Sequence, residues 1–161
     1  MKFIQIVLAF VAVAVVGNAA AQAPRPDDRV ALGGATAAKV VWDINADQAE
    51  KLSLYLDVIQ ETYEDLMRQN ARPEMVLAFR GASVKLLTAE AAAKTPALAT
   101  VARQVDELSK LPGVTLEVCS VATRLFGVDN ATLLAGGKPV GNTFVSLIGY
   151  QARGYAVIPI Y

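Results

Sequence analysis

The sequence predicts an α/β protein, a three-layer sandwich in which a five-stranded, mostly parallel sheet carries helices on both faces. Strand-like and helix-like segments alternate from Lys39 to Tyr161 in the order β-α-β-α-β-α-β-α-β. Residues 75–79 form an unbroken apolar run, which is typical of a parallel strand covered on both faces. The sequence contains no repeat at a fixed period and no second domain pattern. We therefore expect a single domain over residues 39–161.

Four further segments have the character of strands. Residues 39–44 are apolar and rich in β-branched side chains. Residues 114–118 alternate strictly, which indicates a strand with one less buried face. Residues 135–140 suit a loop that leads into a short, weak strand. The last strand is expected at residues 155–158, where Pro159 suits a strand end.

Helical segments are expected between these strands. The longest runs to about Asn70, and Asn45 or Asp47 would cap it, with Gln48 or Glu50 three residues further on, the spacing of a capping box. Pro73 helps to end it. Its apolar stripe recurs at helical intervals and consists of Leu52, Leu56, Ile59, Tyr63 and Leu66. The other helical segments are expected at residues 84–87, 97–110, 121–126 and 144–153.

The start of the chain resembles a secretory signal peptide, which we place at residues 1–21. A basic start precedes an apolar run and then small residues, with cleavage after Ala21 or Ala23; Pro24 disfavours the second position. The alternative, an uncleaved membrane anchor, needs about 20 apolar residues, and the run is only roughly 13 long. Residues 22–38 are rich in Pro, Gly and Ala and are expected to form a flexible arm. The mature protein is therefore predicted to be periplasmic or secreted.

The composition excludes several function classes. Lys+Arg and Asp+Glu number 15 each, so no overall charge favours nucleic acid or a membrane surface as a partner. The chain has no histidine, which removes Ser-His-Asp triads, Cys-His dyads and imidazole-based zinc sites. Its glycine-containing segments match neither a phosphate loop nor a dinucleotide-binding motif. We expect no metal and no cofactor.

The single cysteine, Cys119, is the strongest candidate for chemistry. Open parallel sheets bind ligands beyond the carboxyl ends of their strands, and Cys119 lies at such an end, before a helix whose N–H groups would favour a thiolate. The candidate site residues at the three strand ends that the sequence reveals are Asn45, Arg80, Gly81, Ser83, Cys119 and Ser120.

An inert role for Cys119 is equally open at this point, because free cysteines are among the most buried residues. Strand alternation places it on the face of Thr115 and Glu117, the less apolar one, which favours exposure. Arg80 and Arg124 would supply positive charge beside a thiolate or simply be solvated. Asp43 and Glu117 suit structural or solvent-facing roles better than acid–base chemistry.

The segment Gly113-Val114-x-Leu116-x-Val118-Cys119-x-x-Ala122, closed by Gly127-Val128, resembles the region around the active cysteine of the DsrE/DsrF-like family, which includes the TusD-type sulfur-relay subunits. Residues 79–87 and 146–161 resemble two further segments of that family. Arg80 stands where many relatives have histidine.

The resemblance implies a compact α/β sandwich that assembles as a homotrimer or homohexamer. It also implies that Cys119 carries sulfur as a persulfide and exchanges it with donor or acceptor protein thiols or with small sulfane-sulfur compounds. The expected function is that of a periplasmic sulfur carrier or sulfurtransferase-like protein. The alternatives are a non-catalytic oligomeric binding or assembly protein of the same fold, and a redox sensor.

Overall fold

A computed structural model describes residues 25–161, so the expected signal peptide and both cleavage positions lie outside the described residues. The core of the fold is a five-stranded sheet in the order β4-β3-β2-β1-β5, and every neighbouring pair is parallel. The predicted α/β class and five-stranded sheet are confirmed. The strands are β1 (Ala37–Ile44), β2 (Arg72–Phe79), β3 (Val114–Cys119), β4 (Gly137–Val140) and β5 (Ala156–Ile160).

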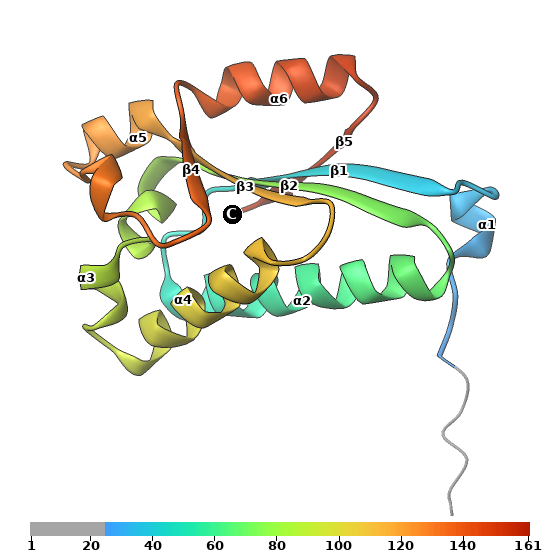
Figure 1. Ribbon diagram of the computed structural model, residues 1–161, viewed down its shortest axis with the longest axis horizontal. Coiled ribbons are helices and arrows are strands. Elements are labelled where there is room, and N and C mark those ends of the chain that lie inside the picture. Colours follow the sequence, from blue (N-terminus) through green and yellow to red (C-terminus); the bar gives the residue numbers. More distant parts are fainter. Residues whose placement is uncertain (1–24) are drawn as a thin grey trace, which may run out of the picture.

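Helices cover both faces of this sheet (Figure 1). The α-helices are α1 (Arg29–Leu32), α2 (Ala49–Arg68), α3 (Ala89–Ala92), α4 (Pro96–Ser109), α5 (Ser120–Leu125) and α6 (Thr143–Ala152), and the 3₁₀ helices are η1 (Gly81–Leu86) and η2 (Asn130–Thr132). Helices α2 and α4 pack on one face, and α6 lies across the other.

The strand order explains why α6 lies on the face opposite α2 and α4. Helices α2 and α4 connect β1 to β2 and β2 to β3, which follow one another in a single direction across the sheet. Helix α6 connects β4 to β5, at opposite ends of the sheet, so its crossover runs in the reverse direction. Because such crossovers are right-handed, reversing the direction moves the connecting helix to the opposite face.

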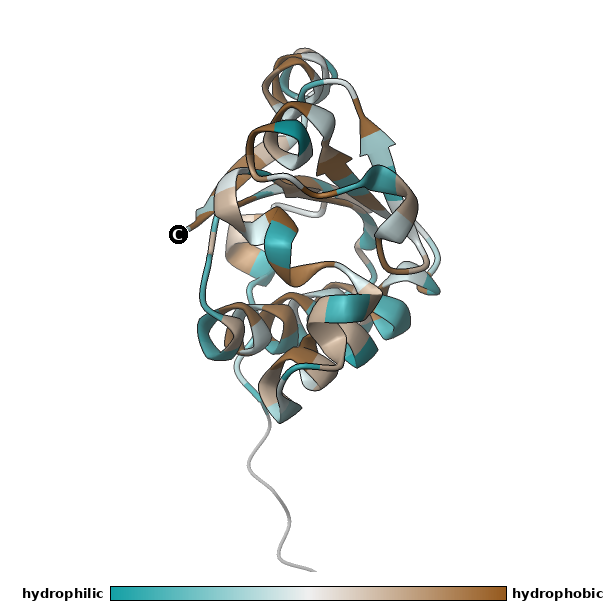
Figure 2. Ribbon diagram, turned by 90° about the vertical axis from the view of Figure 1, so that its left-hand side faces the viewer, coloured by the Kyte–Doolittle hydropathy of each residue, from teal (hydrophilic) through white to brown (hydrophobic). Residues whose placement is uncertain are grey.

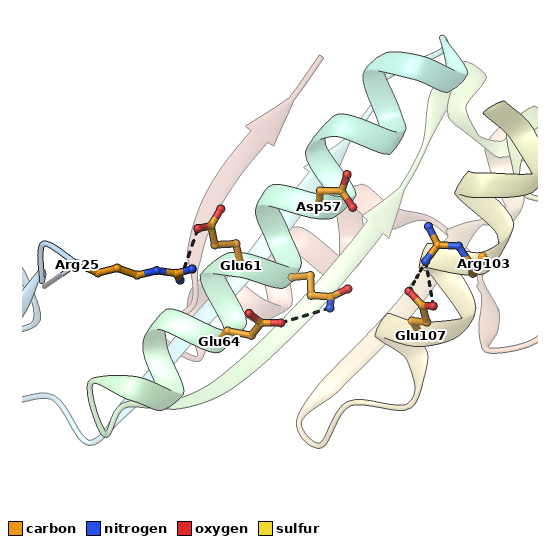
Figure 3. Close-up of a pocket in the computed structure, with 7 residues that line it drawn as sticks. Arg25, Asp57, Glu61, Glu64, Arg103 and Glu107 are labelled. Atoms are coloured by element: carbon orange, nitrogen blue, oxygen red, sulfur yellow. Dashed lines mark hydrogen bonds and ion pairs between the residues drawn. The ribbon is translucent and has the colours of Figure 1, made fainter. Parts of the chain in front are cut away.

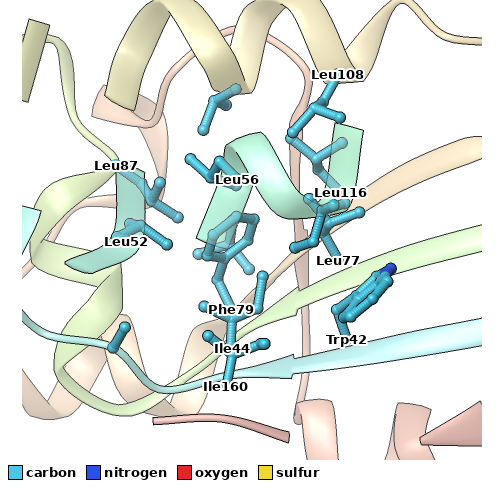
Figure 4. Packing of buried hydrophobic residues seen from close by; sticks show 14 of the residues in the cluster. Trp42, Ile44, Leu52, Leu56, Leu77, Phe79, Leu87, Leu108, Leu116 and Ile160 are labelled. Carbon is cyan, nitrogen blue, oxygen red and sulfur yellow. The ribbon is translucent and has the colours of Figure 1, made fainter. Parts of the chain in front are cut away.

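The larger hydrophobic core lies between the sheet and the α2/α4 layer. Figure 4 shows Phe79 at its centre, with Ile44 from β1 and Leu52 and Leu56 from α2 around it. All four side chains are completely buried. The predicted apolar stripe of α2 is confirmed for four of its residues, which are buried: Leu52, Leu56, Ile59 and Tyr63. In Figure 2 the helices of the α2/α4 layer, at the bottom of the view, alternate between polar and apolar residues, as amphipathic helices do.

The second face of the sheet has a smaller core, made of Val41, Val76, Ala78 and Leu147. The alternation of residues 114–118 predicted that the side chains of β3 on this second face would be less buried. For Glu117 that prediction was wrong. Its side chain is buried and accepts a hydrogen bond of 2.8 Å from the Tyr150 hydroxyl of α6. The sequence pattern reports polarity, and it cannot show that a helix distant in sequence covers a polar position.

Several element boundaries differ from the sequence expectations. Helix α2 begins at Ala49 with Gln48 as its N-cap, and that residue makes no side-chain capping hydrogen bond, so the expected capping box is absent. Strand β2 begins at Arg72 and includes Pro73, near its start. Strand β1 begins at Ala37, inside the segment expected to be an arm.

In the same segment, residues 29–32 form α1, and the Asp28 N–H donates to Gln69 Oε1 at 2.6 Å. None of the helices within residues 25–161 is long and apolar enough to cross a membrane.

Candidate functional site

A pocket of about 200 Å³ opens at the carboxyl end of the sheet, beside Cys119. Because all five strands are parallel, the segments that follow β2, β3 and β4 meet at this end. The pocket is lined mostly by apolar side chains, with a few polar groups between them. The lining residues are Arg80, Gly81, Cys119, Val121, Ala122, Leu125, Phe126, Asn142, Thr143 and Phe144.

Cys119 is the last residue of β3 and the N-cap of α5. Register places it opposite Val140 of β4, and alternation along β3 puts it on the same face as Glu117, as the sequence predicted. Its exposed fraction is 4%, so the expected exposure was wrong. The side chain is nevertheless not sealed, because it forms part of the pocket wall.

The surroundings of Cys119 favour its thiolate. Burial raises the pKa of the thiol, whereas the backbone N–H and hydroxyl of Thr143 and the backbone N–H groups of Ala122 and Val121 lower it. The net pKa lies below the ordinary value for cysteine. Backbone N–H groups at the starts of α5 and α6 therefore favour negative charge on this sulfur atom.

Asn142 and Thr143 are pocket residues that the sequence reading missed. They follow β4, the fourth strand end, and Asn142 caps α6 by accepting a hydrogen bond of 3.0 Å from the Phe144 N–H. The signal in the sequence was this Asn-Thr pair before the last helix. It was overlooked because β4 reads as a short, weak strand, and its position beside β3 is not visible in the sequence.

Arg80 lines the pocket but does not offer a free charge to it. Its Nε and Nη2 donate to the two carboxylate oxygens of Asp43 at 2.5 and 2.8 Å. The pKa of Arg80 is raised, first by this hydrogen bond with Asp43. The guanidinium carbon also lies 5.2 Å from the ring centre of Phe144 and 6.0 Å from that of Tyr161. Asp43 thus has the structural role expected of it, and Arg80 is an anchor of the pocket wall.

Gly81 also lines the pocket, and its backbone explains why glycine stands there. Its φ of 56° is in the left-handed region, and a Cβ atom at this position would overlap Oδ1 of Asn45. Asn45 packs behind Gly81 and does not itself line the pocket. The structure therefore brings Cys119, Arg80 and Gly81 together and places Asn45 in a supporting position.

Ser83 and Ser120 lie outside the pocket. The Ser83 side chain is fully buried, and its hydroxyl donates to the carbonyl oxygen of Arg80 at 2.8 Å. It therefore holds the turn after β2. The Ser120 hydroxyl accepts a hydrogen bond of 3.1 Å from Asn130 Nδ2. Arg124 is exposed and does not line the pocket, so it supplies no charge to the thiol.

A second pocket, of about 310 Å³, lies over α2 and α4 and is strongly polar (Figure 3). Its charged side chains are largely paired with one another. Arg103 donates to both carboxylate oxygens of Glu107 at 2.9 Å, and Arg25 lies 3.8 Å from Glu61. It contains no nucleophile, so it is a weaker candidate for a reactive site than the pocket at Cys119.

Metal binding has no geometric support in the described part of the chain. Among residues 25–161, no three Cys, Asp or Glu side chains lie together in a way that could hold a metal ion. The polar groups at the Cys119 pocket are a thiol, N–H donors, a hydroxyl and an amide, together with an already paired guanidinium. This set suits an anionic sulfur atom far better than a cation.

Together, the fold and the site define an α/β protein with one cysteine, whose thiol pKa is lowered, in a pocket at the carboxyl end of a parallel sheet. The chain belongs to the DsrE/DsrF-like family, whose model matches residues 39–160. Family membership gives it a sulfur-relay-type fold.

Two solved structures are similar to the chain over 76% of its length and 98% of their own. One is MTH1491, a protein of unknown function from Methanobacterium thermoautotrophicum, with 22% identity and a TM-score of 0.61. The other is the ychN protein from E. coli, with 18% identity and a TM-score of 0.58. At these identities the likeness shows the fold alone. No curated protein matches the chain.

Proposed function

We propose that this protein is an exported sulfur carrier, or sulfurtransferase-like protein, that holds sulfur as a persulfide on Cys119. The observation that carries the proposal is the position of the thiol in the wall of an open pocket, where backbone N–H groups and a hydroxyl lower its pKa. Membership of a family with a sulfur-relay-type fold supports the same reaction class.

The proposed reaction is a pair of sulfur-transfer steps without net oxidation or reduction. The Cys119 thiolate attacks the outer sulfur of a persulfide, R–S–SH. A new S–S bond forms on Cys119, the S–S bond of the donor breaks, and its electron pair leaves with R–S⁻. In the second step an acceptor thiolate attacks the outer sulfur of the Cys119 persulfide and releases Cys119 as the thiolate. Donor and acceptor are protein thiols or small sulfane-sulfur compounds.

The experiment is intact-mass measurement of the purified mature protein after incubation with polysulfide or thiosulfate. We expect a gain of one sulfur atom in the wild-type protein that a reducing agent reverses. Cys119→Ser is the matched control and should gain nothing. Failure of the wild-type protein to gain sulfur under conditions in which a small thiol does so would refute the carrier role.

Export is part of the proposal and rests on residues 1–21 alone. The periplasm or the exterior is the compartment in which we expect the mature protein. Expression of the full chain in a bacterium, fractionation, and mass measurement of the mature N-terminus will test this. A start at Gln22 or Pro24 in the exported fraction supports it, and an intact Met1 in the cytoplasm contradicts it.

A second candidate function is a non-catalytic oligomeric binding or assembly protein. The observation that favours it is an exposed apolar surface beside the pocket, which we call the α5/α6 apolar surface: Leu125, Phe126, Phe144, Val145 and Ile148. Such a surface is typical of a protein contact, and a homotrimer or homohexamer is the assembly we propose for it. If this candidate alone is right, Cys119→Ser leaves function intact and the native thiol resists alkylation.

A further inference from the structure

Thr143 has a polar group with no evident structural task. The residue is 1% exposed, and within residues 25–161 its Oγ1 atom has no partner with hydrogen-bond geometry. A buried hydroxyl without a partner loses its hydrogen bonds to water and gains nothing in return, which is costly. Structures retain few such groups, and they call for an explanation in terms of what binds there.

The position of Thr143 supplies that explanation. It is the first residue of α6 and lines the same pocket as Cys119. Cys119 pairs in register with Val140, three residues before Thr143, and the Val121 N–H donates to the Gly141 carbonyl at 3.3 Å, so the β4–α6 turn is fastened to the start of α5. This fastening holds Thr143 in the wall of the pocket that Cys119 also lines.

We propose that Thr143 is a positioning residue whose hydroxyl donates a hydrogen bond to the anionic sulfur of Cys119, first as the thiolate and then as the persulfide. The inference deepens the proposed function and rests on it for the persulfide stage only. The direction of the Cys119 pKa agrees, since both the N–H and the hydroxyl of Thr143 lower it.

This role follows from the hydrogen bonding of the Cys119 sulfur as the thiolate and as the persulfide. A thiolate is a pure acceptor, so an O–H donor that has no other partner is best satisfied when the thiol is ionised. Sulfur transfer keeps one negative charge at the site, because the thiolate is replaced by a persulfide that ionises readily. In the persulfide the charge lies mainly on the outer sulfur, one S–S bond of about 2 Å from Sγ. A donor at the start of α6 therefore serves the thiolate directly, and it serves the persulfide when the outer sulfur turns toward Thr143.

The test measures the rate of Cys119 alkylation by iodoacetamide as a function of pH in the folded protein. Thr143→Val removes the hydroxyl at nearly constant volume and should raise the midpoint of the profile by about one pH unit, so that the rate at neutral pH falls roughly tenfold. Thr143→Ser keeps the hydroxyl and should retain the wild-type midpoint. Asn142→Ala is the matched control, since it weakens the cap of α6 in the same pocket without removing a donor to the sulfur.

The outcomes separate this inference from the proposed function. A midpoint in Thr143→Val equal to that of the wild type, or an equal shift in Asn142→Ala, would overturn the positioning role. If Thr143→Val does not fold, Thr143→Ala and Thr143→Ser decide the same question. A shifted midpoint together with no gain of sulfur by the wild-type protein would leave Thr143 as a thiolate partner and refute only the carrier reaction.

Discussion

Arg80 and Asp43 form a buried ion pair with two parallel hydrogen bonds between neighbouring strands, at the edge of the Cys119 pocket. Asp43 comes from β1, and Arg80 follows the last residue of β2. Their side chains are 10% and 17% exposed, respectively. The guanidinium also faces the rings of Phe144 and Tyr161, so this pair links the sheet to the start of α6 and to the end of the chain.

Breaking this pair from one side should be costly. Asp43→Asn leaves the Arg80 charge buried without its counter-charge and should lower the free energy of unfolding by about 3 kcal/mol. Urea titration monitored by Trp42 fluorescence or circular dichroism measures it. The double variant Asp43→Asn/Arg80→Gln removes both charges. Its loss in the free energy of unfolding should be clearly smaller than the sum of the losses in the two single variants. Strict additivity would show that the two side chains do not depend on each other.

Gly81 and Gly149 predict opposite effects of the same substitution. Gly81→Ala places a side chain at a φ of 56° and against Asn45, and we expect a loss of about 1–2 kcal/mol in the free energy of unfolding. Gly149 lies in α6, where a Cβ atom would meet nothing, so Gly149→Ala should stabilise the protein by up to about 1 kcal/mol. Thermal unfolding of both variants provides the comparison, and equal shifts would contradict it.

The α5/α6 apolar surface predicts which substitution changes the assembly. Ile148→Glu places a charge in that surface and should reduce the mass measured by light scattering toward that of a monomer. Leu54→Glu on α2 alters a similarly exposed apolar residue on the opposite side of the sheet and is the control. A monomeric wild-type protein, or dissociation by Leu54→Glu alone, would argue against an interface at α6.

The fold was predictable from the sequence because its signals are local. The apolar run at residues 75–79 became the buried part of β2, and the stripe from Leu52 to Tyr63 became the buried face of α2. The misplaced start of α2 has a physical reason. A capping box requires side-chain geometry at the helix start, and spacing alone does not supply it, so Gln48 rather than Asn45 or Asp47 stands at the cap.

The candidate site was predictable only in part. Cys119, Arg80 and Gly81 meet at the pocket because parallel strands bring their carboxyl ends together, which strand assignment is enough to predict. Thr143 was missed because its contribution depends on β4 lying beside β3, a long-range pairing that leaves no local pattern. The pairing of Arg80 with Asp43 likewise depends on which strands are neighbours. Burial of Cys119 was missed because residues of α5 and the start of α6 enclose it.

The pH dependence of Cys119 has a definite sign. Its pKa is lowered in the folded protein, so the folded state favours the ionised thiol. Its contribution to stability is therefore fully present above the pKa of the unfolded chain and is lost as the pH falls through the lower pKa of the folded chain. Cys119→Ser should remove this component, and urea titrations of both proteins across that pH range will measure it.

The measurement that tests the central claim most directly is the rate at which iodoacetamide alkylates Cys119 as a function of pH, in the native protein and in urea. We predict that the native thiol reacts, and that its midpoint lies at lower pH than that of the unfolded chain. Two results would contradict the account. One is a thiol that does not react at any pH at which the protein stays folded. The other is a native midpoint at or above the midpoint measured for the unfolded chain in urea.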